Sequence, residues 1–131
     1  MARWLIVEDD PDDQLIFQQA LEQLADIEAV MLSSGDELLD RLENGDVPDL
    51  IFLDLDLPDV SGTEIIAEIR EVDATATLPI LILSSNTSVD RVDHAYRNGA
   101  NTYFAKPPTV DETVELFRGA RDHWSRALPA H

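Results

Sequence analysis

Five short runs of apolar residues predict five buried β-strands. They lie at residues 4–7, 29–32, 50–53, 80–83 and 102–105. The first four are continuous in apolar residues, mostly Ile, Leu and Val, which is typical of a parallel sheet covered on both faces. The fifth run is shorter and mixes Thr, Tyr, Phe and Ala, so it predicts a strand less strongly.

A helical pattern follows each apolar run. Asp10 and Pro11 form a typical helix start after the first run, with Asp10 positioned to cap the helix. The other four helices are predicted to start at a Ser or Thr followed three residues later by an acid. These pairs are Ser34 with Glu37, Ser61 with Glu64, Thr87 with Asp90, and Thr109 with Glu112. Strict alternation of strands and helices predicts an α/β fold with a five-stranded parallel sheet and flanking helices.

Length and charge narrow the class of protein. The 131 residues suit one domain, and we expect a single domain over 1–131, with its core at about 3–125 and no effector domain. The net charge of −18 argues against binding to nucleic acid or to anionic membranes. The chain has no cysteine, no run long enough to span a membrane and no signal peptide pattern, so we expect a cytoplasmic protein.

Polar side chains stand where the predicted strands end. Glu8 and Asp9 follow the first strand, Asp54 follows the third, Ser84 follows the fourth and Lys106 follows the fifth. Ligands of open α/β sheets bind outside the carboxyl ends of the strands. We therefore expect these side chains to share one edge of the sheet and to form a site there.

Carboxylates that crowd together repel each other, and a divalent cation removes that penalty. A set of oxygen ligands without His or Cys favours Mg²⁺ or a similar hard ion. A carboxylate can also act as a nucleophile and form an aspartyl phosphate. Phosphoryl transfer mainly demands positioning and neutralisation of the phosphoryl oxygens, which a metal ion, a lysine and a hydroxyl group supply.

The sequence resembles the receiver domains of two-component response regulators, from residue 3 to about 125. The matching segments are residues 6–10, 48–58, 61–62, 83–85 and 99–107, in the expected order at the strand ends. The resemblance implies a (βα)5 flavodoxin-like (CheY-like) fold with strand order 2-1-3-4-5. It also implies a phospho-acceptor that promotes its own phosphorylation and dephosphorylation and is not an enzyme with a separate substrate.

The resemblance also implies a role for each site residue. Asp54 corresponds to the phospho-acceptor, and Lys106 and Ser84 to the groups that contact the phosphoryl oxygens. Tyr103 stands at the position of the aromatic switch. The metal ligands for Mg²⁺ or Mn²⁺ would be Glu8, Asp9, Asp54 and the main-chain carbonyl of Asp56. The bond between Lys106 and Pro107 is commonly cis in this family.

The expected partners follow from the same resemblance. The phosphoryl donor would be a sensor histidine kinase, and the opening Glu-Asp-Asp-Pro with a Trp near the end is similar to receivers paired with phytochrome-type kinases. The signal would leave through a downstream protein or a phosphotransfer partner. We further expect a homodimer through the fourth helix, fifth strand and fifth helix, to which Phe117 and Trp124 offer aromatic contacts unless both pack inside.

Two other functions remain open at this stage. Asp54-Leu55-Asp56 after an apolar strand matches the nucleophile motif of haloacid dehalogenase-type phosphatases, but Pro58 stands where that family has Thr or Val. That family also carries the motif on its first strand and needs a longer chain. The second alternative is an adaptor with a receiver fold that works without phosphorylation.

Overall fold

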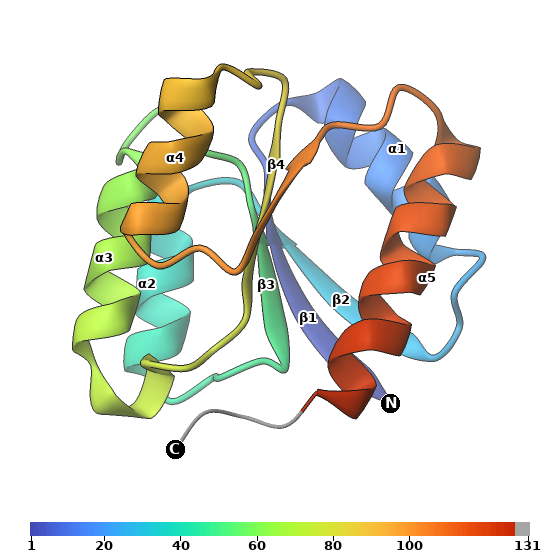
Figure 1. The fold of residues 1–131 in the computed structure, drawn as a ribbon. Coiled ribbons are helices and arrows are strands. Elements are labelled where there is room, and N and C mark those ends of the chain that lie inside the picture. Colours follow the sequence, from blue (N-terminus) through green and yellow to red (C-terminus); the bar gives the residue numbers. More distant parts are fainter. Residues whose placement is uncertain (128–131) are drawn as a thin grey trace.

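The computed structural model describes residues 1–127 and contains a five-stranded parallel sheet in the order β2-β1-β3-β4-β5 (Figure 1). This confirms the predicted fold class and strand order. The strands are β1 (Ala2–Val7), β2 (Ile27–Leu32), β3 (Leu50–Leu53), β4 (Ile80–Ser84) and β5 (Thr102–Ala105). The helices are α1 (Pro11–Leu21), α2 (Gly35–Glu43), α3 (Gly62–Glu71), α4 (Val89–Arg97) and α5 (Val110–Arg126), and a short 3-10 turn, η1 (Asp73–Thr75), follows α3.

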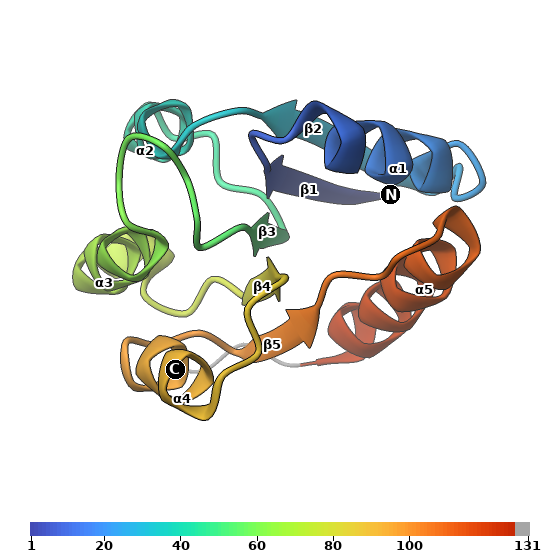
Figure 2. The same cartoon turned by 90° about the horizontal axis from the view of Figure 1, so that it is seen from above.

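The helices cover both faces of the sheet. Figure 2 shows α1 and α5 on one face and α2, α3 and α4 on the other. Alternate strand residues pack into the two layers: Trp4 and Ile6 join the cluster that includes residues of α1 and α5, and Leu5 and Val7 join the other cluster. Burial on both faces explains why β1 shows a continuous apolar run. Within residues 1–127, no helix has the length and apolar character needed to cross a membrane.

Strands β1 and β2 each begin two residues earlier than the apolar runs predicted. Ala2 pairs with Ile27, and the amide of Ala2 donates to the carbonyl of Asp26 at 3.1 Å. The next pair joins Arg3 to Glu28, whose polar side chains interrupt the hydrophobic pattern. The strands continue through this pair because the ladder is made by main-chain groups and does not require apolar side chains.

Two of the four predicted Ser or Thr caps form the expected hydrogen bond. The hydroxyls of Ser34 and Thr109 accept hydrogen bonds at 3.2 Å from the amide groups three residues later. Ser61 is the cap residue of α3 as predicted, but its hydroxyl pairs with that of Thr63 at 2.9 Å instead of accepting from the helix.

The predicted start of α4 is wrong by one residue. The cap is Ser88, not Thr87, and the helix begins at Val89. The side chain of Asn86 accepts a hydrogen bond from the amide of Ser88 at 3.1 Å, which forms an Asx turn. This extra turn delays the helix, so that Thr87 lies in the loop.

Candidate functional site

The predicted site residues meet at the carboxyl edge of the sheet. Main-chain hydrogen bonds carry the ladder one residue past the strand ends: the amide of Asp54 donates to the carbonyl of Val7, and that of Lys106 to the carbonyl of Ser84, both at 3.0 Å. Val7 of β1 pairs with Leu53 of β3, and Glu8 and Asp54 are the residues that directly follow this pair. The backbone therefore fixes where each of these side chains begins.

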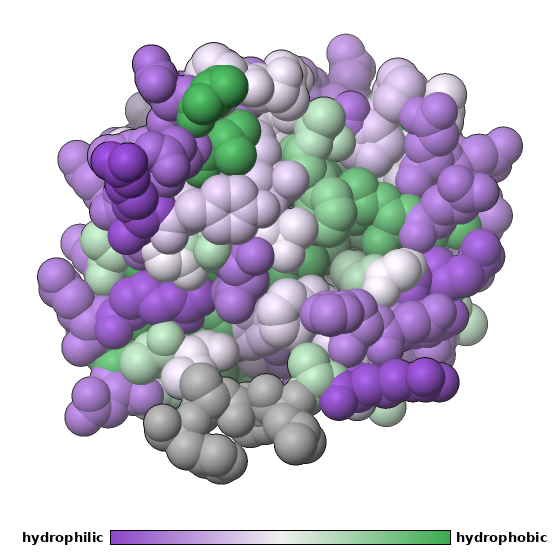
Figure 3. Space-filling view, viewed as in Figure 1, coloured by the Kyte–Doolittle hydropathy of each residue, from purple (hydrophilic) through white to green (hydrophobic). Residues whose placement is uncertain are grey.

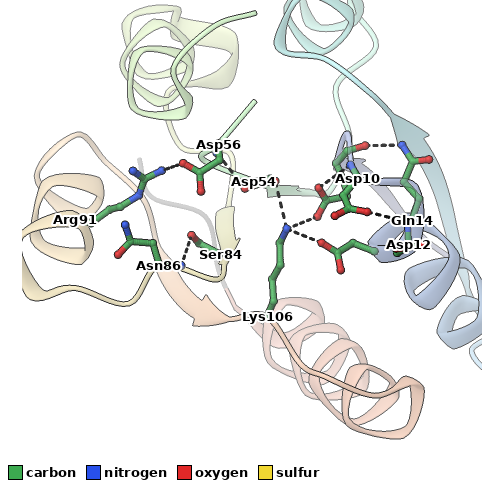
Figure 4. A network of polar contacts seen from close by, with 11 residues as sticks. Asp10, Asp12, Gln14, Asp54, Asp56, Ser84, Asn86, Arg91 and Lys106 are labelled. Carbon is green, nitrogen blue, oxygen red and sulfur yellow. Dashed lines mark hydrogen bonds and ion pairs between the residues drawn. The ribbon is translucent and has the colours of Figure 1, made fainter. Parts of the chain in front are cut away.

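The ammonium group of Lys106 lies among three carboxylates. Its Nζ atom is 2.7 Å from Glu8 Oε1, 2.8 Å from Asp13 Oδ2 and 3.3 Å from Asp54 Oδ2. The side chain of Lys106 is 14% exposed, and Figure 4 shows it extending from the end of β5 toward Asp54. The structure thus brings together the predicted acceptor, the predicted lysine and one acid of the predicted pair.

Burial and charge shift the pKa values at this centre. Burial raises the pKa of Glu8 to about 7, with Asp54 also raising it, although the ammonium of Lys106 opposes the shift. Burial alone would lower the pKa of Lys106, but the carboxylates of Asp13, Glu8 and Asp54 outweigh it and raise that pKa above its usual value. Lys106 therefore stays charged, while the buried Glu8 carries its charge at a cost.

Three carboxylates are placed to hold a cation. Glu8, Asp9 and Asp54 each offer an oxygen, and these oxygens lie within 4.8 Å of one another. Glu8 Oε1 is buried and lacks an aligned hydrogen bond among the described residues; its close contact is the ion pair with Lys106. A buried oxygen without a hydrogen bond, in a cluster of carboxylates with no nitrogen or sulfur ligand, suits a hard divalent ion. The residues present therefore fit such an ion.

The loop after β1 orients this cluster. Asp10 caps α1, as predicted, by accepting from the amide of Asp12 at 2.8 Å, and its own amide donates to Glu8 Oε2 at 3.2 Å. The side chain of Gln14 donates to the carbonyl of Glu8 at 2.6 Å. Capping turns Asp10 toward the helix, which leaves Glu8 and Asp9 as the acids beside Asp54.

Ser84 and Tyr103 contact the same loop residue. Ser84 is fully buried, and its hydroxyl accepts from the amide of Asn86 at 3.1 Å. The hydroxyl of Tyr103, which is half-buried, donates to the carbonyl of Asn86 at 2.5 Å. Movement of the loop at Asn86 would therefore change the hydrogen bonds of both side chains.

Asp56 borders the site through its main chain. Its amide donates to Asp54 Oδ1 at 3.0 Å, while its carboxylate forms an ion pair with Arg91 of α4. Figure 4 shows this pair on the side of Asp54 away from Lys106. The role of the Asp56 carbonyl as a metal ligand stays a prediction.

One expectation about the backbone is wrong. The peptide bond between Lys106 and Pro107 is trans. Trans is the intrinsically preferred form even before proline.

Two contacts of this site were not predicted. These are the ion pair of Asp13 with Lys106 and the ion pair of Arg91 with Asp56. Asp13 is the third helical residue after the Asp10 cap, and the first turn of α1 lies beside the strand ends. That proximity is the signal that could have pointed to Asp13; nothing in the pattern pointed to the pairing of Arg91 with Asp56.

Comparison with known sequences finds one family over most of the chain. The model of the response regulator receiver domain matches residues 4–118. The response regulator Rcp1 from Synechocystis is 30% identical in an alignment of 135 positions. The alignment covers 96% of this chain and 92% of Rcp1.

Solved structures agree with this match. The Mn²⁺-bound form of Rcp1 has a TM-score of 0.83 at 29% identity, covering 99% of this chain and 100% of that one. RPA3017, a response regulator in red light signalling of R. palustris, has a TM-score of 0.87 at 25% identity, covering 100% and 99%. The phosphorylated cyanobacterial phytochrome response regulator RcpA has a TM-score of 0.86 at 28% identity, covering 99% of both chains.

Proposed function

The chain belongs to the response regulator receiver family of two-component systems, and we propose that it accepts a phosphoryl group from a histidine kinase on Asp54. The observation that carries the proposal is the contact of a 5% exposed Asp54 with Lys106, beside two further acids. Incubation with acetyl phosphate and Mg²⁺ tests it: covalent incorporation of phosphate supports the proposal, and none would contradict it.

In the proposed reaction a carboxylate oxygen of Asp54 attacks the phosphorus of a phosphohistidine. The new P–O bond forms as the P–N bond breaks, and the bonding pair returns to the imidazole nitrogen. Lys106 offers N–H donors to the phosphoryl oxygens from a site that is largely closed to water, where such charges act strongly. Ser84, at the end of the neighbouring strand β4, supplies a hydroxyl that can hydrogen-bond to the phosphoryl group.

Glu8, Asp9 and Asp54 are the side chains that would hold a divalent ion, which we propose to be Mg²⁺ or Mn²⁺. Bound there, the ion supplies positive charge against the phosphoryl oxygens. The fully buried Glu8 Oε1 and the Mn²⁺-bound form of the similar Rcp1 both support this proposal. The chain itself acts as acceptor and does not turn over a separate substrate.

Metal should stabilise the protein, and Asp9→Ala should remove most of that gain. An ion that binds only the folded state at about 100 times its Kd raises the free energy of unfolding by about 2.7 kcal/mol. Thermal unfolding with and without Mg²⁺ measures this effect. Asp12→Ala, at an exposed acid in the first turn of α1, is the matched control and should keep the gain. An equal gain in Asp9→Ala would show that Asp9 is not a ligand.

We further propose that the kinase is of the phytochrome type. RcpA is described as a phytochrome response regulator and RPA3017 as acting in red light signalling, and both match nearly the whole of this chain. Histidine kinases take their phosphate from ATP, so this proposal places the reaction in the cytoplasm. The signal then passes to a downstream protein or along a phosphorelay.

The surface proposed to carry the signal is formed by α4, β5 and α5, and we propose that it also joins two copies of the chain. Val89 is 82% exposed and Tyr96 is 43% exposed, both on α4. Figure 3, which faces this surface, shows apolar residues over the top of α4 and in the hollow between β5 and α5. Exposed apolar area of this kind is typical of an interaction surface.

Phe117 does not belong to this surface, so that part of the dimer argument is wrong. The side chain is fully buried and packs against Trp4, Phe17 and Phe52. Trp124 is half-buried against the same cluster. Burial prevails because Phe117 faces the sheet, where it removes a large aromatic area from water.

A dimer through this surface should dissociate when Val89 is replaced by Ser. Light scattering at micromolar concentration, with and without beryllium fluoride, should give the mass of a dimer for the unchanged protein and of a monomer for Val89→Ser. Val72→Ser, at a 55% exposed valine just after α3, is the control and should remain a dimer. Added salt should strengthen the dimer because it screens the charge of −18. A monomer in every condition would rule out this interface.

The two alternative functions are less well supported. The motif at Asp54 follows β3, whereas dehalogenase-type phosphatases carry it on the first strand, and the family match does not favour that class. An adaptor that works without phosphorylation would have no need for the ion pairs around Lys106. Such an adaptor would also take up no phosphate in the test above.

A further inference from the structure

Lys106 holds two carboxylates more closely than it holds the proposed acceptor. Its Nζ atom is 3.3 Å from Asp54 but 2.8 Å from Asp13 and 2.7 Å from Glu8. An ammonium group has three N–H donors. Two of them form hydrogen bonds to Asp13 and Asp54, and Glu8 forms an ion pair with the same nitrogen. Before phosphorylation, Lys106 is therefore already bound by three carboxylates, and the hydrogen bond to Asp13 is shorter than the one to Asp54.

The backbone that carries Asp13 is held in this position. It lies in the first turn of α1, one turn after the Asp10 cap, and its carboxylate is 28% exposed. The next residue, Gln14, ties the same turn to the carbonyl of Glu8 at 2.6 Å and to the hydroxyl of Ser33 at 3.3 Å. These bonds fix the start of the helix against the strand ends, so the backbone of Asp13 stays beside Lys106.

We propose that Asp13 is a positioning residue that competes with the phosphoryl group for Lys106 and so limits the stability of the phosphorylated state. This inference rests on the proposed function of Asp54. When a phosphoryl group is attached to Asp54, Lys106 must turn an N–H toward its oxygens, and the bond to Asp13 opposes that turn.

Asp13→Asn should therefore strengthen binding of beryllium fluoride, a mimic of the phosphoryl group, at saturating Mg²⁺. The variant keeps the shape of the side chain but loses its charge, and hydrogen bonds between charged groups are stronger than neutral ones, so we expect binding to tighten about tenfold. Asp12→Asn is the control, because Asp12 carries the same charge one residue earlier and is exposed. Its affinity should stay within about twofold of the unchanged protein, since exposed charges are screened.

The role of Lys106 is tested by combining the changes. If Asp13 acts by restraining Lys106, then Asp13→Asn should have no effect on binding in a Lys106→Ala background. A purely structural role would not produce this dependence. Thermal unfolding and a separate Mg²⁺ titration of each variant show whether the fold and the metal affinity are kept.

The outcomes separate this inference from the proposed function. If the unchanged protein neither binds beryllium fluoride nor takes up phosphate, the proposed function is wrong and the inference is wrong with it. If it binds but Asp13→Asn binds equally or more weakly, only the role of Asp13 is overturned. The same holds if the gain persists in the Lys106→Ala background, because Asp13 would then act by charge alone.

Discussion

Asp54→Asn should abolish phosphorylation while leaving the protein folded. The amide oxygen of Asn is a much poorer nucleophile than a carboxylate, so no acyl phosphate can form at this position. The fold should tolerate the change because Asn has the same shape, and because Lys106 keeps its ion pairs with Glu8 and Asp13. Loss of one charge from a crowded acid cluster should leave the free energy of unfolding equal or slightly higher.

The measurement is phosphate incorporation from acetyl phosphate in the presence of Mg²⁺, read from intact protein mass. Asp56→Asn is the matched control, since Asp56 lies two residues away and its carboxylate points to Arg91. That variant should still take up phosphate. Undiminished labelling of Asp54→Asn, or loss of labelling in Asp56→Asn alone, would move the acceptor to another residue.

Phe117→Ala should destabilise the protein by about 3–5 kcal/mol, the range for removing a buried aromatic ring. Its ring centroid lies 5.0 Å from that of Phe52, 5.6 Å from that of Trp4 and 5.8 Å from that of Phe17, so the change leaves a cavity between α5 and the sheet. Leu15→Ala, at a leucine that is 53% exposed, is the control and should cost far less.

Urea unfolding at two protein concentrations measures the loss and locates its origin. A core residue lowers stability equally at both concentrations, whereas an interface residue acts through dimer dissociation and depends on concentration. A loss below about 1 kcal/mol would contradict the packing of Phe117, because that is far less than burial of such a ring provides.

The strands were predictable because burial on both faces forces apolar residues at every position of a central strand. Leu50–Leu53 is a continuous apolar run, and its ends agree with β3. The edge strand β2 is different: its residues between Ile27 and Leu32 are exposed or half-buried, and the exposed Glu28 lies within the strand. Where the side chains are no longer apolar, the hydrophobic pattern does not predict the strand, although the main-chain pairing continues.

The position of the site was predictable for the same reason. A polar residue directly after a buried strand, such as Asp54 or Lys106, must emerge at the carboxyl edge of the sheet. The contact of Asp13 with Lys106 could not be found in this way, because the two residues are 93 positions apart and meet only if α1 has one particular rotation. The helix dipole alone favours an acid in a first helical turn, so the presence of Asp13 there gives no sign of its contact with Lys106.

The central claim is that Asp54 carries the phosphoryl group, and borohydride reduction of the labelled protein tests it most directly. Borohydride converts an aspartyl phosphate to homoserine, so the modified position can be read from peptide masses after proteolysis. We predict homoserine at position 54 after incubation with acetyl phosphate and Mg²⁺, and none there without the donor. Homoserine at Asp9, Asp13 or Asp56 instead, or at no position in protein that has taken up phosphate, would contradict the account.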